Sequence, residues 1–166
     1  MRTPIRKPGK YTGLKPDPYI TREKYNKLKL SLDRLIKTDR PLAIKDVKEQ
    51  AAFGDFSENA AYGIAKGKLR GINNKILRIE GYLKNAIIID ENKKSNTVQL
   101  GSIVTIKSGN KTKQYKILGS AEVNIAKGII SHNSPLGSSL IGKSQGEIIK
   151  IKIKDQPVEF KILKIE

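Results

Sequence analysis

The sequence contains no cysteine and no tryptophan, and it has a single histidine, His132. Without cysteine, disulfide bonds, thiol chemistry and cysteine-based zinc sites are excluded. One histidine leaves no histidine-rich metal site and little general-base chemistry of the usual kind. Aromatic side chains are also scarce, with six Tyr and three Phe in a chain of 166 residues that is 37% hydrophobic. This composition disfavours one broad aromatic core and favours a thin coiled coil with a small β-rich module.

Long apolar runs are also missing from the chain. No stretch approaches the roughly 18 consecutive apolar residues of a membrane-spanning helix. The N-terminal stretch from Met1 to Tyr19 is basic, but it lacks the apolar segment of a secretion signal. We therefore expect a cytoplasmic protein with no membrane partner.

Acidic residues are a minority, with 16 Asp and Glu against 33 Lys and Arg and a formal net charge of +17. The excess is spread along the chain, with +4 in residues 1–20, +7 in residues 21–86 and +6 in residues 87–166. A charge of this size favours anionic partners, whereas a dedicated nucleic-acid motif would usually concentrate it. We expect weak, nonspecific binding to nucleic acid.

The chain divides into three parts by composition and periodicity. Residues 1–19 contain four prolines and five basic residues, which predicts a flexible basic tail. Residues 20–86 carry helical periodicity, and residues 87–166 carry strand patterns. The predicted fold class is therefore α+β, with an N-terminal antiparallel coiled-coil hairpin before a small α+β domain.

The first predicted helix starts with Thr21 as N-cap. Asp39-Arg40-Pro41 interrupts the pattern, because proline removes a helical hydrogen bond, although it is tolerated in the first turn of a new segment. The apolar positions before the interruption are Tyr25, Leu28, Leu32 and Leu35, and those that resume the helix after it are Leu42, Ile44, Val47 and Ala51.

The second predicted helix runs from Glu58 to Ala86. Its apolar residues alternate steps of three and four, which is the seam of a coiled coil. They are Tyr62, Ala65, Leu69, Ile72, Ile76, Ile79, Leu83 and Ala86. Gly63, Gly67 and Gly71 lie off this seam, and each costs about 1 kcal/mol of helix stability relative to Ala.

The C-terminal part predicts short strands joined by turns. Ser108-Gly109-Asn110 indicates a hairpin turn, and Ser134-Pro135 predicts the start of a short helix that runs to Leu140-Ile141. The predicted strands cover residues 87–89, 102–106, 114–118, 129–131, 147–153 and 158–163.

Two carboxylates, Asp55 and Glu58, lie in the glycine-led break between the two helices. Their spacing is typical of a capping box, in which Asp55 would cap the second helix and Glu58 would return a hydrogen bond. Alternatively, the pair forms an acidic tip that a stiff rod carries into another molecule's active site.

Two longer motifs favour the second interpretation. Gly54-Asp55-x-Ser57-Glu58-Asn59-Ala60-x-Tyr62 resembles the tip of the bacterial transcript cleavage factors GreA and GreB. The stretch from Ser131 to Glu147, which begins Ser-His-Asn-Ser-Pro-Leu-Gly, resembles the second signature of this family, in its FKBP-like C-terminal domain. The resemblance covers residues 19–166, and Lys66-x-Lys68-Leu69-Arg70 with Asp39-Arg40-Pro41 looks closer to GreB.

The resemblance implies an elongation factor that is not itself an enzyme. Such factors bind bacterial RNA polymerase at its secondary channel and stimulate Mg²⁺-dependent cleavage of backtracked RNA, which rescues arrested complexes. It implies Asp55 and Glu58 as the functional pair, with Mg²⁺ held only together with the polymerase, and a monomeric factor that contacts the nascent RNA 3′ end. The remaining implied site residues are Lys66 and Arg70 for RNA, and Ser131, Asn133, Ser134 and Pro135 for polymerase.

Several alternatives remain open from the sequence. Lys66 and Arg70 could equally form a solvated helix face. A related factor could occupy the same channel as a regulator or inhibitor without cleavage activity. A prolyl isomerase is disfavoured because residues 87–166 contain only Tyr115 and Phe160 to line an aromatic pocket. We expect His132 to be an exposed surface residue.

Overall fold

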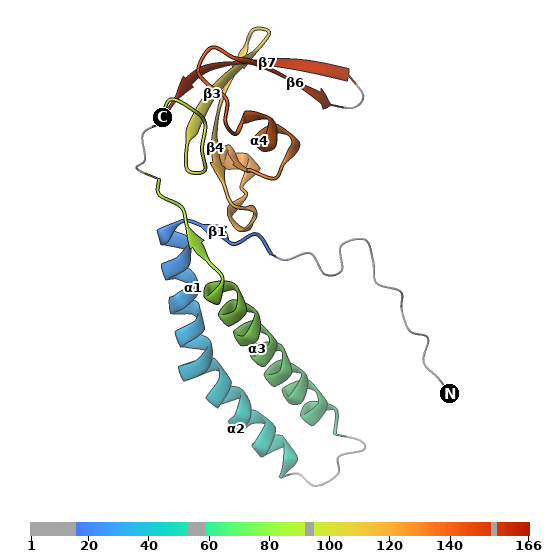
Figure 1. Ribbon diagram of the computed structural model, residues 1–166. Coiled ribbons are helices and arrows are strands. Elements are labelled where there is room, and N and C mark those ends of the chain that lie inside the picture. The colour runs from blue at the N-terminus through green and yellow to red at the C-terminus, as the bar shows by residue number, and fades with distance from the viewer. Residues whose placement is uncertain (1–15, 53–58, 92–94, 154–155) are drawn as a thin grey trace, which may run out of the picture.

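The computed structural model describes residues 16–52, 59–91, 95–153 and 156–166. A long helical hairpin extends from one end of a small sheet domain (Figure 1). The predicted fold class, a helical hairpin followed by an α+β domain, is confirmed.

The first arm of the hairpin is one continuous helix with an unusual turn in its middle. It consists of α1 (Arg22–Arg34), the π-helical turn η1 (Leu35–Asp39) and α2 (Arg40–Ala51). Pro41 is the second residue of α2, and the wide turn before it accommodates its missing N–H. Arg40 donates its backbone N–H to Leu35 O, five residues back. The expected interruption is therefore a wide turn, and the helix continues through it.

The π turn changes which residue faces the partner helix. A π turn holds one residue more than an α turn, so the apolar positions that follow it are displaced by one. Ala43 is 1% exposed, whereas Leu42 is 61% exposed. The sequence prediction that Leu42 lies on the apolar face is wrong for this reason.

The second arm is α3 (Ala60–Lys84), which lies antiparallel to the first arm (Figure 1). It begins two residues after the predicted start at Glu58 and ends two before Ala86. All eight residues of the predicted seam are buried or half-buried, which confirms the coiled-coil assignment. Ala43 and Ala65 are small and nearly inaccessible, so the helix axes approach closely in the half of the hairpin that lies away from the sheet.

The sheet domain contains one five-stranded mixed sheet in the order β5-β4-β3-β7-β6. Its core is aliphatic, and burying each such side chain contributes about 1.5–3 kcal/mol. The strands are β3 (Ile103–Ser108), β4 (Lys111–Leu118), β5 (Ile129–Ser131), β6 (Ile148–Ile153) and β7 (Gln156–Ile165). The core residues are Val98, Val104, Ile106, Ile117, Leu140, Ile149, Ile151 and Ile162.

Shorter elements surround this sheet and connect it to the hairpin. Every predicted strand has a counterpart, and Gly109 takes a positive φ of 56° in the predicted turn between β3 and β4. The shorter elements are α4 (Pro135–Leu140), the 3₁₀ turns η2 (Ser120–Glu122) and η3 (Ile125–Lys127), and the parallel pair β1 (Tyr19–Ile20) and β2 (Ile87–Ile88).

Hydrogen bonds to two carboxylates join the base of the hairpin to the sheet domain. The four residues that make these bonds are Asp17, Thr21, Ser120 and Glu122, and we call them the anchor. Thr21 donates its backbone N–H and its hydroxyl to the Glu122 carboxylate, both at 2.7 Å. Ser120 donates its backbone N–H at 2.7 Å and its hydroxyl at 2.8 Å to Asp17 Oδ2. Thr21 Oγ also accepts from Lys24 N–H at 3.1 Å, which confirms Thr21 as the N-cap of α1.

The chain that forms the anchor packs very tightly against η2. A Cβ placed on Gly119 would lie 1.8 Å from the backbone oxygen of Tyr19, so only glycine fits there. Ile20 is fully buried. Asp17 and Tyr19, which the sequence assigns to the tail, therefore belong to the folded part.

Tyr82, near the end of α3, lies close to the anchor. Its hydroxyl is buried and has no hydrogen-bond partner among the described residues. Burial, and then the negative charges of Asp17 and Glu122, raise the pKa of Tyr82 to about 12. The hydroxyl therefore contributes a desolvation cost that no hydrogen bond offsets.

Replacing this tyrosine tests that cost. We expect Tyr82→Phe to leave the free energy of unfolding unchanged or to raise it by about 1 kcal/mol, because an unsatisfied hydroxyl is removed. The raised pKa also means that the native protein loses stability as pH rises from 10.0 toward 12, where the unfolded chain ionises first. Urea denaturation at pH 10.0 and at pH 12 measures this effect. The free energy of unfolding should fall less between these two pH values in Tyr82→Phe than in the native protein. A loss above about 1 kcal/mol at neutral pH would mean that the hydroxyl has a partner.

The glycines on the outer side of α3 offer a second test. A Cβ on Gly67 would meet no atom within 4 Å, so alanine fits without strain. We expect Gly67→Ala to raise the free energy of unfolding by about 1 kcal/mol, because alanine has the higher helix propensity. Gly119→Ala is the matched control and should destabilise, because its Cβ would collide with Tyr19. Urea denaturation measures both, and a destabilised Gly67→Ala would contradict the open surroundings of this position.

Candidate functional site

The predicted acidic pair, Asp55 and Glu58, lies outside the described residues. The structure describes the chain on both sides of the pair, up to Ala52 after α2 and from Asn59 before α3. Both points are at the end of the hairpin that is farthest from the sheet domain (Figure 1). The first and last residues of α3 are separated by about 36 Å at 1.5 Å per residue.

Asn59 ties the two helix ends together. Its side-chain oxygen accepts from Tyr62 N–H at 2.9 Å, which makes Asn59 the N-cap of α3. Its side-chain nitrogen donates to Gln50 O at 2.9 Å, near the end of α2. The alternative in which Asp55 caps this helix is wrong, because Asn59 holds that position. Asn is a preferred N-cap residue, and this signal could have identified it from the sequence.

A basic helix face follows the start of α3. Lys66 and Arg70 are both exposed and lie four residues apart. Lys66 Nζ is 5.7 Å from the centroid of the Tyr62 ring, within range of a cation–π interaction. No ion pair between described residues engages either cation, whereas Lys68 pairs with Asp46 at 3.7 Å. Both predicted RNA-contact residues are thus open to an anionic group.

The second predicted contact region, residues 131–135, lies at the base of the hairpin, beside the anchor. Ser131 is 8% exposed, and its hydroxyl lies 2.9 Å from Ser120 Oγ and accepts from Asn133 N–H at 3.0 Å. Ser134 caps α4 by accepting from Gly137 N–H at 3.0 Å. Ser131 therefore shapes the loop from within, while Asn133 and Pro135 are exposed on its surface.

His132 is largely buried, so the expectation of an exposed surface residue is wrong. Its side chain is 19% exposed, and its ring meets the Tyr19 ring edge-on with centroids 5.5 Å apart. Its Nδ1 lies 3.5 Å from Asp17 Oδ2. A local sequence pattern cannot reveal this, because both partners come from the N-terminal segment.

Asp17 is the acceptor on which this loop and the anchor converge. Burial raises the pKa of Asp17, but hydrogen bonds from Ser120 and from Tyr19 N–H, with the nearby His132, outweigh it and hold the pKa below its ordinary value. Asn133 also reaches the same carboxylate at 3.5 Å. Asp17 thus remains charged at neutral pH and fixes the loop against the base of the hairpin.

The described ranges contain no group of three or more His, Asp or Glu side chains that could hold a metal ion. Within the same ranges, no helix has the length and apolar character needed to span a membrane.

The Asn59 clamp gives a test of how the hairpin end is held. We expect Asn59→Ala to lower the free energy of unfolding by about 1–2 kcal/mol, because the cap and the bond to Gln50 are both lost. Asn59→Asp keeps an oxygen for the Tyr62 N–H but loses the donor to Gln50, so its loss should be smaller. Thermal unfolding followed by circular dichroism measures the three proteins. Equal losses in both variants would show that the Gln50 bond alone matters.

Comparison with known proteins gives a consistent result for both halves of the chain. Residues 18–88 match the family model described as "Transcription elongation factor, N-terminal", and residues 93–166 match "Transcription elongation factor, GreA/GreB, C-term". The chain is 38% identical over 136 residues to "Transcription elongation factor GreA" of Staphylococcus epidermidis, covering 81% of this chain and 86% of that protein. It is 36% identical over 149 residues to the protein of that name from Clostridioides difficile, covering 88% and 94%.

Among solved structures, the Gfh1 protein of Thermus thermophilus is 24% identical and aligns over 89% of this chain and 97% of its own, with a TM-score of 0.41. Both halves of the chain match models of one family, and the two GreA proteins are 38% and 36% identical to it over most of their length. The chain belongs to the GreA/GreB family of transcription elongation factors.

Proposed function

We propose that this protein binds bacterial RNA polymerase and stimulates the polymerase to cleave backtracked RNA, without being a nuclease itself. The observation that carries this proposal is the position of the acidic segment. The break that contains Asp55 and Glu58 separates two helices that end together at the far end of a long, narrow hairpin. A hairpin of two helices is narrow, so its far end can enter a channel in another molecule.

The roles of the chain's own residues follow from their chemistry. The carboxylates of Asp55 and Glu58 can supply oxygen ligands or hold a water molecule in place, but two such groups are too few to retain Mg²⁺ alone. Mg²⁺ bound jointly with the polymerase would supply Lewis acidity for phosphodiester hydrolysis. Lys66 and Arg70, on the first turns of α3, would attract the phosphates of the RNA 3′ segment.

Docking would use the loop at the base of the hairpin. Asn133, Ser134 and Pro135 present the surface of the loop, and buried Ser131 holds its shape from beneath. Because the loop is bonded to Asp17 at the base of the hairpin, a partner bound there would also determine the direction in which the hairpin points. This coupling would deliver the acids to a fixed place.

Substitution of the acids tests the proposal directly. We expect Asp55→Asn to lower the rate of RNA cleavage in a defined backtracked complex by about 100-fold, because an amide is a much weaker metal ligand than a carboxylate. Glu58→Gln should lower it less, since we assign Glu58 to assist through bound water. The measurement is gel analysis of end-labelled RNA with purified polymerase.

Controls separate binding from cleavage. Glu80→Gln removes an exposed carboxylate elsewhere on α3 and should leave cleavage unchanged, and all variants should bind polymerase with equal affinity. RNA incubated with Mg²⁺ and this protein alone should stay intact. Near-normal cleavage by Asp55→Asn would refute the role of the pair. Absence of cleavage with the native protein, despite binding, would instead identify a channel-binding regulator or inhibitor.

The same gel reports the length of the released fragments. The similarity of Lys66-x-Lys68-Leu69-Arg70 to GreB favours longer fragments, whereas the curated relatives cited above are named GreA. Fragments of only a few nucleotides would contradict the GreB-like prediction and leave the cleavage function intact.

A further inference from the structure

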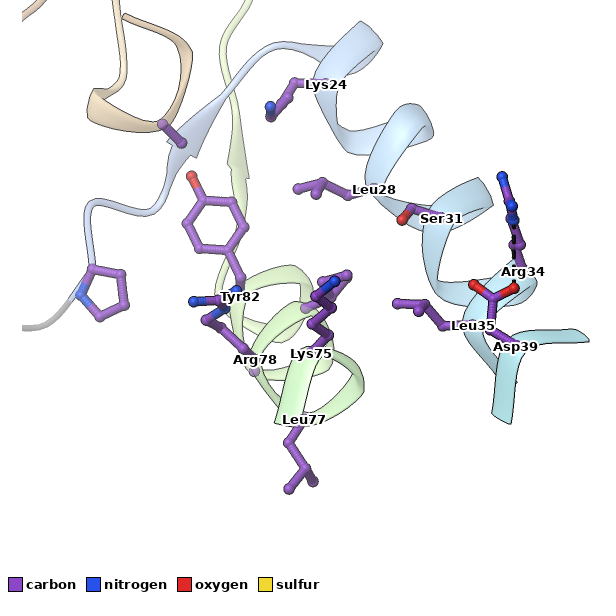
Figure 2. A pocket seen from close by; sticks show the side chains of 14 residues that line it. Lys24, Leu28, Ser31, Arg34, Leu35, Asp39, Lys75, Leu77, Arg78 and Tyr82 are labelled. Carbon is purple, nitrogen blue, oxygen red and sulfur yellow. Dashed lines mark ion pairs between the residues drawn. The ribbon is translucent and has the colours of Figure 1, made fainter. Parts of the chain in front are cut away.

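A long groove runs along one side of the hairpin, beside the seam where the two arms pack together. A hollow of about 1080 Å³ lies between the first arm and α3, near the sheet domain (Figure 2). A second hollow of about 470 Å³ follows it toward the far end and shares Leu35, Asp39 and Lys75 with the first. We call the two together the side groove, which runs between residues 24–42 of the first arm and residues 68–82 of α3.

The floor of the side groove is apolar. Leu28 and Leu35 point from the first arm toward α3, and Tyr82 faces them from the other side (Figure 2). Ile72 and Ile79 complete the floor along α3. Leu28 and Leu35 are seven residues apart on α1 and the start of the π turn, which is the repeat by which one helix presents side chains to another. Leu42 follows beyond the π turn, at the edge of the same groove.

Leu42 is left uncovered because of the π turn. The turn moves Ala43 into the seam and leaves Leu42 at the lip of the groove, 61% exposed. Leu35 and Asp39, the first and last residues of the turn, line both hollows. π turns often occur at functional sites, and this one opens the groove at its midpoint.

The rim of the side groove is positively charged. Lys24, Lys75 and Arg78 line it and take part in no ion pair between described residues. Two other cations are already compensated, since Arg34 lies 3.6 Å from Asp39 and Lys68 lies 3.7 Å from Asp46. The charge therefore favours an acidic occupant. It disfavours a second copy of this chain, at +17, and the basic N-terminal segment.

The dimensions indicate what kind of acidic partner fits. Lys68 to Tyr82 spans about 21 Å along α3, which matches about four turns of a third helix. A helix in this position would bury its own apolar stripe on the leucines and place acidic flanking residues beside the lysines. Single-stranded nucleic acid would satisfy the cations, but it would leave the aliphatic floor without a complementary surface.

We propose that the side groove binds an acidic amphipathic helix of a partner protein, forming a local three-helix bundle along the hairpin. The residues that line the side groove are distinct from those assigned to cleavage and to docking of the polymerase.

A designed peptide tests the proposal with the full-length protein. The probe is a fluorescein-labelled helix of three heptads, with leucine at the seam positions and glutamate beside them. We expect saturable binding by fluorescence anisotropy, and we expect Leu42→Ala and Lys75→Glu each to weaken it about tenfold. Leu30→Ala and Lys29→Glu are the matched controls on α1, because both residues are exposed and neither lines the groove. These controls should change the affinity less than twofold.

Two further probes distinguish other occupants. The same peptide with lysine in place of glutamate should not bind, and a single-stranded RNA of equal charge should bind without sensitivity to Leu42→Ala. Circular dichroism confirms that each variant is folded. Failure of the acidic peptide to saturate, equal binding of the lysine peptide, or binding unaffected by Leu42→Ala would overturn the proposal. RNA binding that weakens with both groove variants would also overturn it.

Discussion

The direction of the hairpin depends on the exchange of hydrogen bonds at the anchor. Asp17 belongs to the segment before α1 and accepts from Ser120 of the sheet domain, while Glu122 of the sheet domain accepts from Thr21 at the start of α1. Each carboxylate thus accepts bonds from the other side of the junction. Charge-assisted hydrogen bonds of this kind are roughly twice as strong as neutral ones. Together with the β1–β2 pairing, they make the junction a fixed joint.

Because the joint is fixed, its geometry sets the position of the far end of the hairpin relative to the sheet domain. The loop at residues 131–135 is bonded to the anchor through Ser131 and Ser120, and the far end of the hairpin is closed by Asn59. The stalk between them is held by a narrow seam with alanine at its tightest points. A partner bound at the loop would therefore determine where the acidic segment reaches, and small errors at the anchor would be magnified along the hairpin. Glycine is required at residue 119 because a Cβ there would lie 1.8 Å from the backbone oxygen of Tyr19.

The π turn accommodates Pro41, but it also shifts which residues of the first arm enter the seam. Pro41 cannot supply the N–H that a regular helix requires, and the widened turn lets the first arm continue without a break. The consequence is an exposed leucine and an open hollow beside the seam. The exposed leucine lies beside cations that form no ion pair with the residues that the structure describes, and this combination supports a binding role.

Patterns among residues close together in the sequence determined most of the helices and strands. The three–four spacing from Tyr62 to Leu83, the N-cap at Thr21, the helix start at Ser134-Pro135 and the alternating strands were predicted correctly, because periodicity and helix starts depend on neighbouring residues. Only the tertiary structure placed Asp17 against Ser120, buried His132 beside Tyr19, bonded Asn59 to Gln50 and moved Leu42 out of the seam. Each of these outcomes depends on residues far apart in the chain or on the phase of a whole helix, and hydrogen bonds and packing over such separations leave no periodic trace in the sequence.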